Sequence, residues 1–372
     1  MIMRYEDRII KTIWSRNKKF FYWEKIELLY LQHILKRNKP INLLSACLET
    51  IDRYERETKH ELVAFLKEMN DRLSVFSNIP ATKYLHYGLT SSDIIDTAMS
   101  LQIRESVDYT VLNLLTLKSK LNGLLNIDQQ TIGRTHGKHA EPIEFKHRIQ
   151  FFINELDHAI LKFKQSKSFL YGKLRGPVGT ASFVNKKAAK ATLKELKLEE
   201  APSFTQVIPR HFYLDTMYSC VLLSSFYERF ATFIRLSAID EINELQEGFS
   251  KGQTGSSAMP HKKNPISAEK ICGLSRYVQS NFQVALSNIN LWWERDISHS
   301  SNERLIWPET FHVINHSTSV MITLIENLQI NLENMQTNLD NSTSSSHQEL
   351  LKFSLETGRF SSYSKLQDKY IK

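Results

Sequence analysis

Long stretches without glycine or proline alternate apolar and polar residues with a helical period. Residues 89–122, 210–247 and 274–307 contain neither Gly nor Pro, which permits helices well beyond the usual length of about 11 to 12 residues. Two of these regions carry an apolar stripe with steps of three and four residues, as the buried face of a helix requires. The stripes consist of Leu114, Leu117, Leu121 and Leu124, and of Leu222, Phe226, Phe230 and Phe233. The pattern predicts an all-α fold built on an antiparallel bundle of long helices.

Breaks in the pattern predict three domains. Residues 1–95 form a smaller N-terminal helical domain, 96–338 a central bundle of long helices, and 339–372 a shortened C-terminal segment. The segment Thr90-Ser91-Ser92-Asp93 opens the first long helix, and the serine-rich run 341–346 is the best candidate for a linker. Residues 172–179 predict turns or a short hairpin. Core candidates in the first domain are Trp14, Phe21, Ile26, Leu29 and Leu35.

Composition narrows the class of protein. A chain of 372 residues can bury a large core without disulfides or metals, and its three cysteines lie far apart, which suits a reducing compartment and predicts the cytoplasm. The N-terminus lacks the features of a signal peptide, and no run of about 18 apolar residues predicts a membrane span. The net charge of +8 is spread along the chain. It fits an anionic substrate, and we expect no nucleic-acid or membrane partner.

The loop at residues 252–265 has the strongest chemical signal. It combines two glycines, adjacent serines, two lysines and two prolines in the order Gly252-Gln253-Thr254-Gly255-Ser256-Ser257-Ala258-Met259-Pro260-His261-Lys262-Lys263-Asn264-Pro265. Such a loop can fold over an anion and place hydroxyls beside positive charge. Gly- and Ser-rich stretches are also common linkers, but a linker does not require the ordered tail of this segment.

Histidines and a second polar block lie at other breaks in the helical pattern. His60, His86 and His136 are candidates for proton transfer because histidine titrates near neutral pH, although each also fits an ordinary polar loop. The hydroxyls of residues 90–92 fit a helix N-cap and an anion site equally. Residues 293–304 read either as a solvated helical face or as a site for a phosphate or carboxylate. No pattern for a metal, P-loop or dinucleotide site is present, and we expect no cofactor.

Together these segments resemble the fumarase/aspartase superfamily of helical lyases and, within it, the adenylosuccinate lyase family. Residues 255–265 are similar to the superfamily signature G-S-S-x-M-P-x-K-x-N-P. Residues 86–93, 134–137 and 294–304 are similar to blocks of the adenylosuccinate lyases, and the resemblance extends from residue 4 to about residue 338. It implies β-elimination of fumarate from adenylosuccinate and from the succinyl-carboxamide ribotide of purine synthesis.

The resemblance also implies roles for individual residues. Ser256 corresponds to the general base, His136 to the general acid, and Glu269 to the carboxylate that orients this acid. Lys262 would lower the proton affinity of the base, and His60 and His86 would assist binding and charge balance. The implied contacts to the succinyl carboxylates are Thr90, Ser91, Ser257, Lys262 and Asn264. The implied contacts to the phosphate are Arg4, Tyr5, Arg295, Ser300 and Arg304, and further substrate contacts are Gln206, Lys59, Glu61 and Lys263. Family members are homotetramers whose sites draw on three subunits.

Three departures from the family pattern leave alternatives open. Glu61 stands where the family usually has Asp, Lys270 stands where Asn is expected, and the C-terminal segment is short by some dozens of residues. One alternative is a related lyase that releases fumarate from a different succinyl-amine. The other is an inactive structural homologue, against which the presence of Ser256, His136, Lys262 and Glu269 argues.

Overall fold

The computed structural model describes residues 1–41, 43, 45–75, 81–249 and 252–371. The described chain forms two compact units, each assembled from three segments. Unit one comprises residues 1–114, 159–225 and 274–318, and unit two comprises residues 115–158, 226–273 and 319–372. The two compact units each combine three separated segments of the chain. They therefore do not test the predicted domain boundaries at residues 95 and 338, which stay a prediction.

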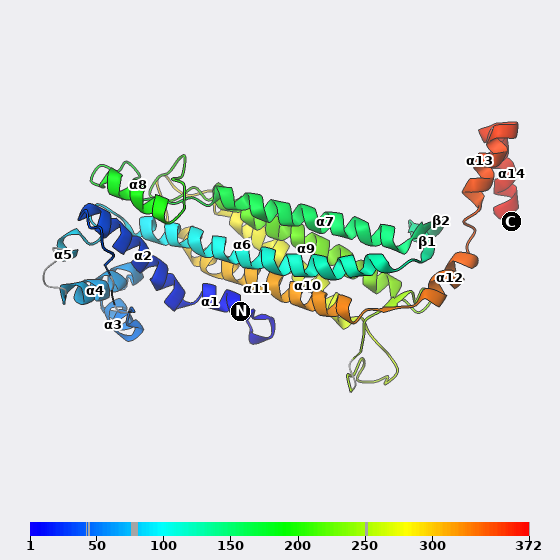
Figure 1. Ribbon diagram of the computed structural model, residues 1–372, viewed down its shortest axis with the longest axis horizontal. Coiled ribbons are helices and arrows are strands. Elements are labelled where there is room, and N and C mark those ends of the chain that lie inside the picture. The colour runs from blue at the N-terminus through cyan, green and yellow to red at the C-terminus, as the bar shows by residue number, and fades with distance from the viewer. Residues whose placement is uncertain (42, 44, 76–80, 250–251, 372) are drawn as a thin grey trace. The chain divides into compact units, whose positions relative to one another are not determined.

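Five long helices contribute residues to both units and confirm the expected all-α class (Figure 1). They are α6 (Ser91–Gly123), α7 (Phe145–Ser166), α9 (His211–Ser237), α10 (Ile266–Ser287) and α11 (Ser298–Glu326). Within unit one, polar pairs join these helices in the bundle. Asn113 of α6 donates to Asn315 of α11 at 2.9 Å, and Asn281 of α10 donates to Thr310 of α11 at 3.0 Å.

Shorter helices complete the two units. In unit one they are η1 (Met3–Tyr5), α1 (Arg8–Ile13), α2 (Arg16–Ile34), α3 (Leu48–Thr58), α4 (Glu61–Ser74), α5 (Ala81–Tyr84), η3 (Lys167–Phe169) and α8 (Lys186–Glu195). In unit two they are η2 (Leu124–Asn126), α12 (Leu332–Asp340), α13 (Ser346–Thr357) and α14 (Arg359–Tyr370). None of the described helices combines the length and apolar character needed to cross a bilayer.

Two small antiparallel sheets lie in unit two. Strand β1 (Gln130–Thr135) pairs with β2 (Lys138–Glu144), and β3 (Leu245–Gln246) pairs with β4 (Gln329–Ile330). Residues 172–179 were predicted to form turns or a short hairpin, and the first of these alternatives is confirmed. That segment forms turns, and Gly172 makes only an isolated parallel bridge to Glu200.

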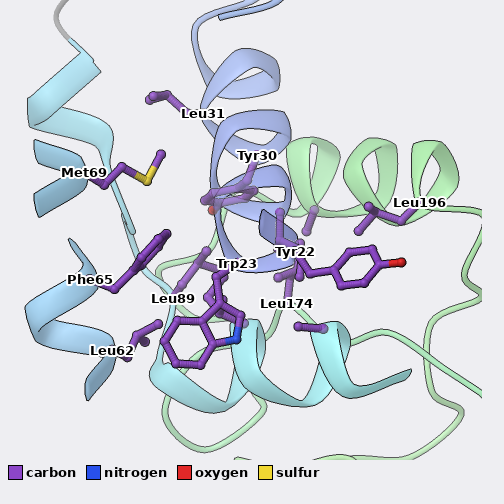
Figure 2. Packing of buried hydrophobic residues seen from close by; sticks show 14 of the residues in the cluster. Tyr22, Trp23, Tyr30, Leu31, Leu62, Phe65, Met69, Leu89, Leu174 and Leu196 are labelled. Carbon is purple, nitrogen blue, oxygen red and sulfur yellow. The ribbon is translucent and has the colours of Figure 1, made fainter. Parts of the chain in front are cut away.

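An aromatic core supports the N-terminal part of unit one. Helix α2 buries Phe20, Trp23 and Tyr30 in this core. Figure 2 shows Trp23 and Tyr30 with Phe65 of α4 and Leu174 among the buried side chains. The rings of Phe20 and Phe65 stack at 5.5 Å between centroids. Among the predicted core residues Ile26 is fully buried, but Phe21 is 54% exposed. Phe21 follows Phe20 directly on the helix, so it points about 100° away from the buried stripe.

The polar residues around 294–298 interrupt the expected helix over 274–307. Helix α10 ends at Ser287 and α11 begins at Ser298. Between them, the Asp296 carboxylate accepts hydrogen bonds from the backbone N–H of Trp292 at 2.8 Å and of Ser298 at 2.7 Å. A short acidic side chain that bonds to neighbouring backbone competes with the helical ladder, which explains the break without glycine or proline.

Candidate active site

Unit one contains a cavity of about 250 Å³ whose wall is rich in arginine. Three residues predicted to bind phosphate, Arg295, Ser300 and Arg304, line this cavity together with the predicted Glu61. The other lining residues are Trp14, Arg16, Lys19, Trp23, Ser92, Ile95, Asp96, Met99, Gln102, Arg210, His299, Glu303 and Pro308. We call this space the arginine cavity.

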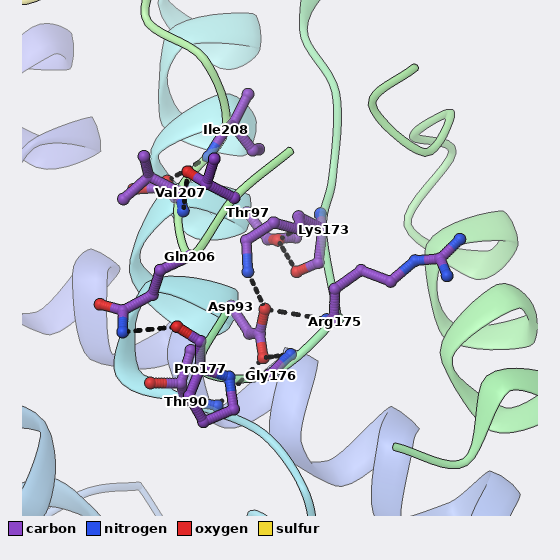
Figure 3. A network of polar contacts seen from close by, with 12 residues as sticks. Thr90, Asp93, Thr97, Lys173, Arg175, Gly176, Pro177, Gln206, Val207 and Ile208 are labelled. Carbon is purple, nitrogen blue, oxygen red and sulfur yellow. Dashed lines mark hydrogen bonds and ion pairs between the residues drawn. The ribbon is translucent and has the colours of Figure 1, made fainter. Parts of the chain in front are cut away.

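Gln206 and Arg295, both predicted to contact substrate, also contact each other. The Arg295 guanidinium donates through Nη1 to the Gln206 side-chain oxygen at 2.6 Å. Gln206 is held in turn, because its amide donates to the Pro177 carbonyl at 2.8 Å (Figure 3). The Nε of Arg295 is buried and has no hydrogen-bond partner. Burial lowers the pKa of Arg295, so an anion placed here would relieve an unfavourable desolvation.

A buried ion triad forms part of the same wall. Arg210 donates to both carboxylate oxygens of Asp96, at 2.8 and 3.0 Å, and to both oxygens of Glu303 at 3.1 Å. Burial disfavours the charge of Arg210, but the attraction of the two carboxylates outweighs it and raises the pKa of Arg210. The bidentate geometry therefore ties α6 and α11 to the segment before α9. The motif-based prediction did not include Asp96 or Arg210.

His299 lies in the same wall and is 3% exposed. Its Nδ1 atom is buried without a hydrogen-bond partner. Burial, together with the positive charge of Arg210, lowers the pKa of His299 to about 4. His299 is therefore a neutral imidazole at physiological pH. The predicted roles did not include this residue, although its position between two predicted phosphate contacts, Arg295 and Ser300, was a signal.

At the rim of the arginine cavity, Glu61 pairs with two cations. Its carboxylate accepts a hydrogen bond from Lys19 and lies 3.8 Å from Arg304, whose side chain is 68% exposed. The neighbouring His60 caps α4, since its Nδ1 accepts the Val63 N–H at 3.4 Å. Lys59 ends α3 with a left-handed backbone (φ +54°). Glu61 thus lies beside Lys19 while His60 serves as the helix cap.

The N-terminus of α6 is pinned by a buried carboxylate. Asp93 accepts the backbone N–H groups of Thr90 at 3.0 Å, Arg175 at 3.0 Å and Gly176 at 2.8 Å, and it also pairs with the buried Lys173 (Figure 3). This network connects the start of α6, where Thr90 and Ser91 lie, to the loop that holds Gln206. Neither Thr90 nor Ser91 lines the arginine cavity, so their contact with a succinyl carboxylate stays a prediction.

Three further predicted residues of unit one lie outside the lining of the arginine cavity. Arg4 and Tyr5 lie in η1, where Arg4 is exposed and the Tyr5 ring packs against His316 at 5.3 Å between centroids. His86 lies after α5 with its Nδ1 atom 2.5 Å from a carboxylate oxygen of Glu27.

Unit two holds the predicted general base. The Ser256 hydroxyl oxygen accepts the backbone N–H of Met259 at 3.1 Å and of Ala258 at 3.3 Å. The loop is closed by the Asn264 amide, which donates to the Gly255 carbonyl at 2.9 Å. A side chain at position 255 would place its Cβ 2.2 Å from the Lys262 carbonyl, so only glycine fits there. Two N–H donors directed at one hydroxyl oxygen would stabilise an alkoxide.

The remaining predicted residues of unit two are accessible. His136 and Gly137 form the two-residue turn between β1 and β2, with φ of +54° and +75°, which is the geometry of a type I′ hairpin turn. The turn presents an exposed His136 side chain. Glu269 is exposed in the first turn of α10. Ser257, Lys262 and Lys263 are exposed in the loop before α10. The described residues hold no group of three or more side chains arranged to bind a metal ion.

Comparison with solved structures defines the fold. A fumarate lyase from Mesorhizobium sp. BNC1 superimposes with a TM-score of 0.83 at 20% identity, covering 98% of this chain and 86% of that chain. The 3-carboxy-cis,cis-muconate lactonizing enzyme from Pseudomonas putida gives a TM-score of 0.83 at 18% identity, covering 98% and 85%. The chain therefore has the same helical fold as these two enzymes, and the predicted fold class is confirmed.

Sequence comparison defines the family. The model of the lyase family matches residues 46–280. Adenylosuccinate lyase from Aquifex aeolicus is 35% identical over 345 residues, covering 89% of this chain and 78% of that protein. The enzyme from Bacillus subtilis is 33% identical with the same coverage, and that from Pyrococcus abyssi is 39% identical over 76% of this chain and 63% of that protein. The chain belongs to the adenylosuccinate lyase family of the fumarase/aspartase superfamily. The predicted resemblance is confirmed, and the chain is a carbon–nitrogen lyase.

Proposed function

We propose that this protein removes fumarate from adenylosuccinate, giving AMP, and from the succinyl-carboxamide ribotide, giving the free carboxamide ribotide. The observation that carries this proposal is the identity of 33–39% to curated adenylosuccinate lyases over most of the chain. The arginine cavity supports it. Arg295, Ser300 and Arg304 on one wall suit the phosphate of a nucleotide.

In the proposed reaction, Ser256 takes the proton from the carbon next to a succinyl carboxylate. Negative charge then builds on that carboxylate, and cationic and N–H donors must stabilise it. Lys262, Asn264, Ser257, Thr90 and Ser91 would supply these donors. The two backbone N–H groups that already contact Ser256 support its role, because they favour the deprotonated hydroxyl.

The carbon–nitrogen bond then breaks as the nitrogen accepts a proton. We assign this proton to His136, with Glu269 as the carboxylate that orients it. His60 and His86 balance the charge of the substrate, and Lys59, Glu61, Lys263 and Gln206 complete the substrate contacts. Arg4 and Tyr5 would join the phosphate contacts. The two-residue turn fixes the backbone from which the His136 side chain projects.

The test is fumarate release from adenylosuccinate by the full chain, followed by ultraviolet absorbance. Ser256→Ala should lower kcat by about three orders of magnitude or more while KM stays close to the wild-type value, since loss of a base acts on the transition state. Thr254→Ala removes another hydroxyl of the same loop and should retain activity. Wild-type turnover by Ser256→Ala would refute the base assignment, and no release by the wild type would direct attention to other succinyl-amines.

We also propose a homotetramer in a reducing compartment such as the cytoplasm, acting on a small-molecule substrate. Sharing of sites between subunits is implied by the resemblance to the adenylosuccinate lyase family. The compartment is supported by three free cysteines, two of them buried.

A further inference from the structure

A carboxylate is buried in the N-terminal core beside His86. Glu27 lies on α2 with no exposed surface, and its Oε1 atom is 2.5 Å from Nδ1 of His86. Its second carboxylate oxygen has no hydrogen-bond partner. Burying a carboxylate is costly unless a cation or a set of donors compensates. His86 is the partner that offsets the desolvation of Glu27.

Helix α2 also fixes the backbone around His86. Tyr30 lies three residues after Glu27 on the same face, and its hydroxyl donates to the Tyr87 carbonyl at 3.1 Å. His86 itself has a left-handed backbone with φ +56°. At Gly88, two residues after His86, a Cβ atom would lie 2.3 Å from the Phe183 carbonyl oxygen. The turn is thus held by close packing, and Glu27 contacts the imidazole ring itself.

The charges around His86 favour its protonated form. Burial disfavours the charge, but the attraction and hydrogen bond of Glu27 outweigh it and raise the pKa of His86. Asp93 at the start of α6 acts in the same direction, although Lys173 already pairs with it. Tyr30 stays neutral because burial raises its pKa to about 12.

We propose that Glu27 is a positioning residue for His86. It binds Nδ1, fixes the orientation of the imidazole ring and favours its protonated form, so that His86 presents a fixed cation to an anionic group of the substrate. The part of this inference that concerns the substrate rests on the proposed lyase function. The orientation and charge of the ring do not.

Glu24 provides a matched control. It lies one turn earlier on α2, is half-buried, and makes an ion pair with Arg72 at 2.5 Å. Glu24→Gln and Glu27→Gln each remove one ion pair from the same helix. Only Glu27→Gln removes the partner of His86, so a purely structural role predicts the same effects for both variants.

The first measurement is histidine C2 hydrogen–deuterium exchange, read for each histidine by peptide mass spectrometry over a range of pH. It reports the titration of His86 in the full chain without requiring turnover. We expect the His86 midpoint in Glu27→Gln to fall by about one pH unit or more, because burial then acts without the compensating charge. The midpoint should not move in Glu24→Gln. An unchanged His86 midpoint in Glu27→Gln would refute the inference.

The second measurement is KM for adenylosuccinate at pH 6 and pH 8. Glu27→Gln should raise KM about tenfold at pH 8, the loss expected for one charge-assisted hydrogen bond, and the increase should shrink as the pH is lowered, because acid restores the proton on His86. An increase in KM of the same size at both pH values would contradict the role of the cation. If Glu27→Gln does not fold, Glu27→Asp keeps the charge with a shorter reach and should shift the His86 midpoint in the same direction by a smaller amount.

The two readouts separate the two proposals. A shifted His86 midpoint in a protein without lyase activity would sink the proposed function and leave the positioning role standing. Lyase activity together with an unchanged His86 midpoint in Glu27→Gln would support the proposed function and refute the positioning role of Glu27.

Discussion

Two residues in the wall of the arginine cavity each have a buried polar atom without a hydrogen-bond partner. Arg295 Nε and His299 Nδ1 are both buried without a partner, whereas most buried polar atoms in folded proteins are hydrogen-bonded. Both atoms belong to residues that line the same cavity. A ligand that supplies an acceptor to Arg295 and a hydroxyl or N–H to the neutral His299 would satisfy both, as the phosphate and sugar of a nucleotide can.

His299 predicts a specific dependence of stability on pH. Its pKa is about 4 in the folded chain and about 6.5 in an unfolded chain. Below pH 6.5 the unfolded state therefore binds more protons, and stability falls as the pH decreases from 6.5 towards 4. The loss should reach at most about 1.4 kcal/mol per pH unit for this one group. Above pH 6.5 the group contributes no slope.

The measurement is urea unfolding at fixed protein concentration between pH 7.5 and pH 5. His299→Asn should unfold with a shallower acid slope than the wild type. His60→Asn is the control, because His60 is exposed and Asn also caps a helix well; it should keep the wild-type slope. Equal slopes for His299→Asn and the wild type would show that His299 is not held neutral.

At the scale of elements, the start of α6 depends on one buried ion pair. Asp93 and Lys173 are both fully buried, and Asp93 also holds three backbone N–H groups. Asp93→Asn would leave Lys173 buried without an anion and should cost about 3 to 5 kcal/mol of unfolding free energy. Adding Lys173→Met to the same chain removes the unpaired charge. The double variant should recover part of that loss in urea unfolding, and recovery of none of it would show that the backbone contacts of Asp93 dominate.

The β1–β2 hairpin predicts which substitution isolates the chemistry of His136. Both turn positions have positive φ, and Asn-Gly is the preferred pair for such a turn. His136→Asn should therefore keep the hairpin and its melting temperature while lowering kcat by a factor of about 10² to 10⁴, the usual contribution of a general acid. Gly137→Ala should do the opposite, lowering stability by about 1 kcal/mol through backbone strain. A fall in substrate affinity alone for His136→Asn would make His136 a binding residue.

The sequence predicts helix ends well where glycine or proline marks them. It predicts them poorly where hydrogen bonds from a side chain to the backbone end the helix. Gly88 and Gly123 bracket α6, which runs from Ser91 to Gly123. The break before α11 depends instead on two local bonds of Asp296, which no glycine or proline marks. Glu27 did leave a signal, since it falls on the buried stripe of α2 between Trp23 and Tyr30. A charged residue in an apolar stripe indicates a buried partner.

At the scale of the whole molecule, the sequence identifies site residues that lie in short motifs. It does not identify contacts between residues that are far apart in the chain. The predicted site residues came from short contiguous motifs, and the structure assigns them to two compact units. The triad of Asp96, Arg210 and Glu303 joins residues more than 90 positions apart. Nothing in the spacing of a single sequence indicates such a pair, because the contact arises only when the long helices pack.

The proposed sharing of sites between subunits predicts the outcome of a mixing experiment. His86 and Arg295 belong to unit one, and Ser256 belongs to unit two. If each site of a homotetramer takes its unit-one residues from one subunit and Ser256 from another, His86→Gln and Ser256→Ala are defective in different subunits of the same site. Random reassembly of equal amounts should restore about a quarter of the wild-type sites, since each of the two contributions is intact half of the time.

The control mixture is His86→Gln with Arg295→Ala, which places both defects in unit one. Every site then contains one defective unit, and fumarate release should stay at the level of the separate variants. Both mixtures are dissociated, reassembled at equal concentration and checked for tetramers before assay. Restored activity in the first mixture alone supports sites shared between subunits. No restoration in either mixture, from reassembled tetramers, would mean that each chain supplies its whole site.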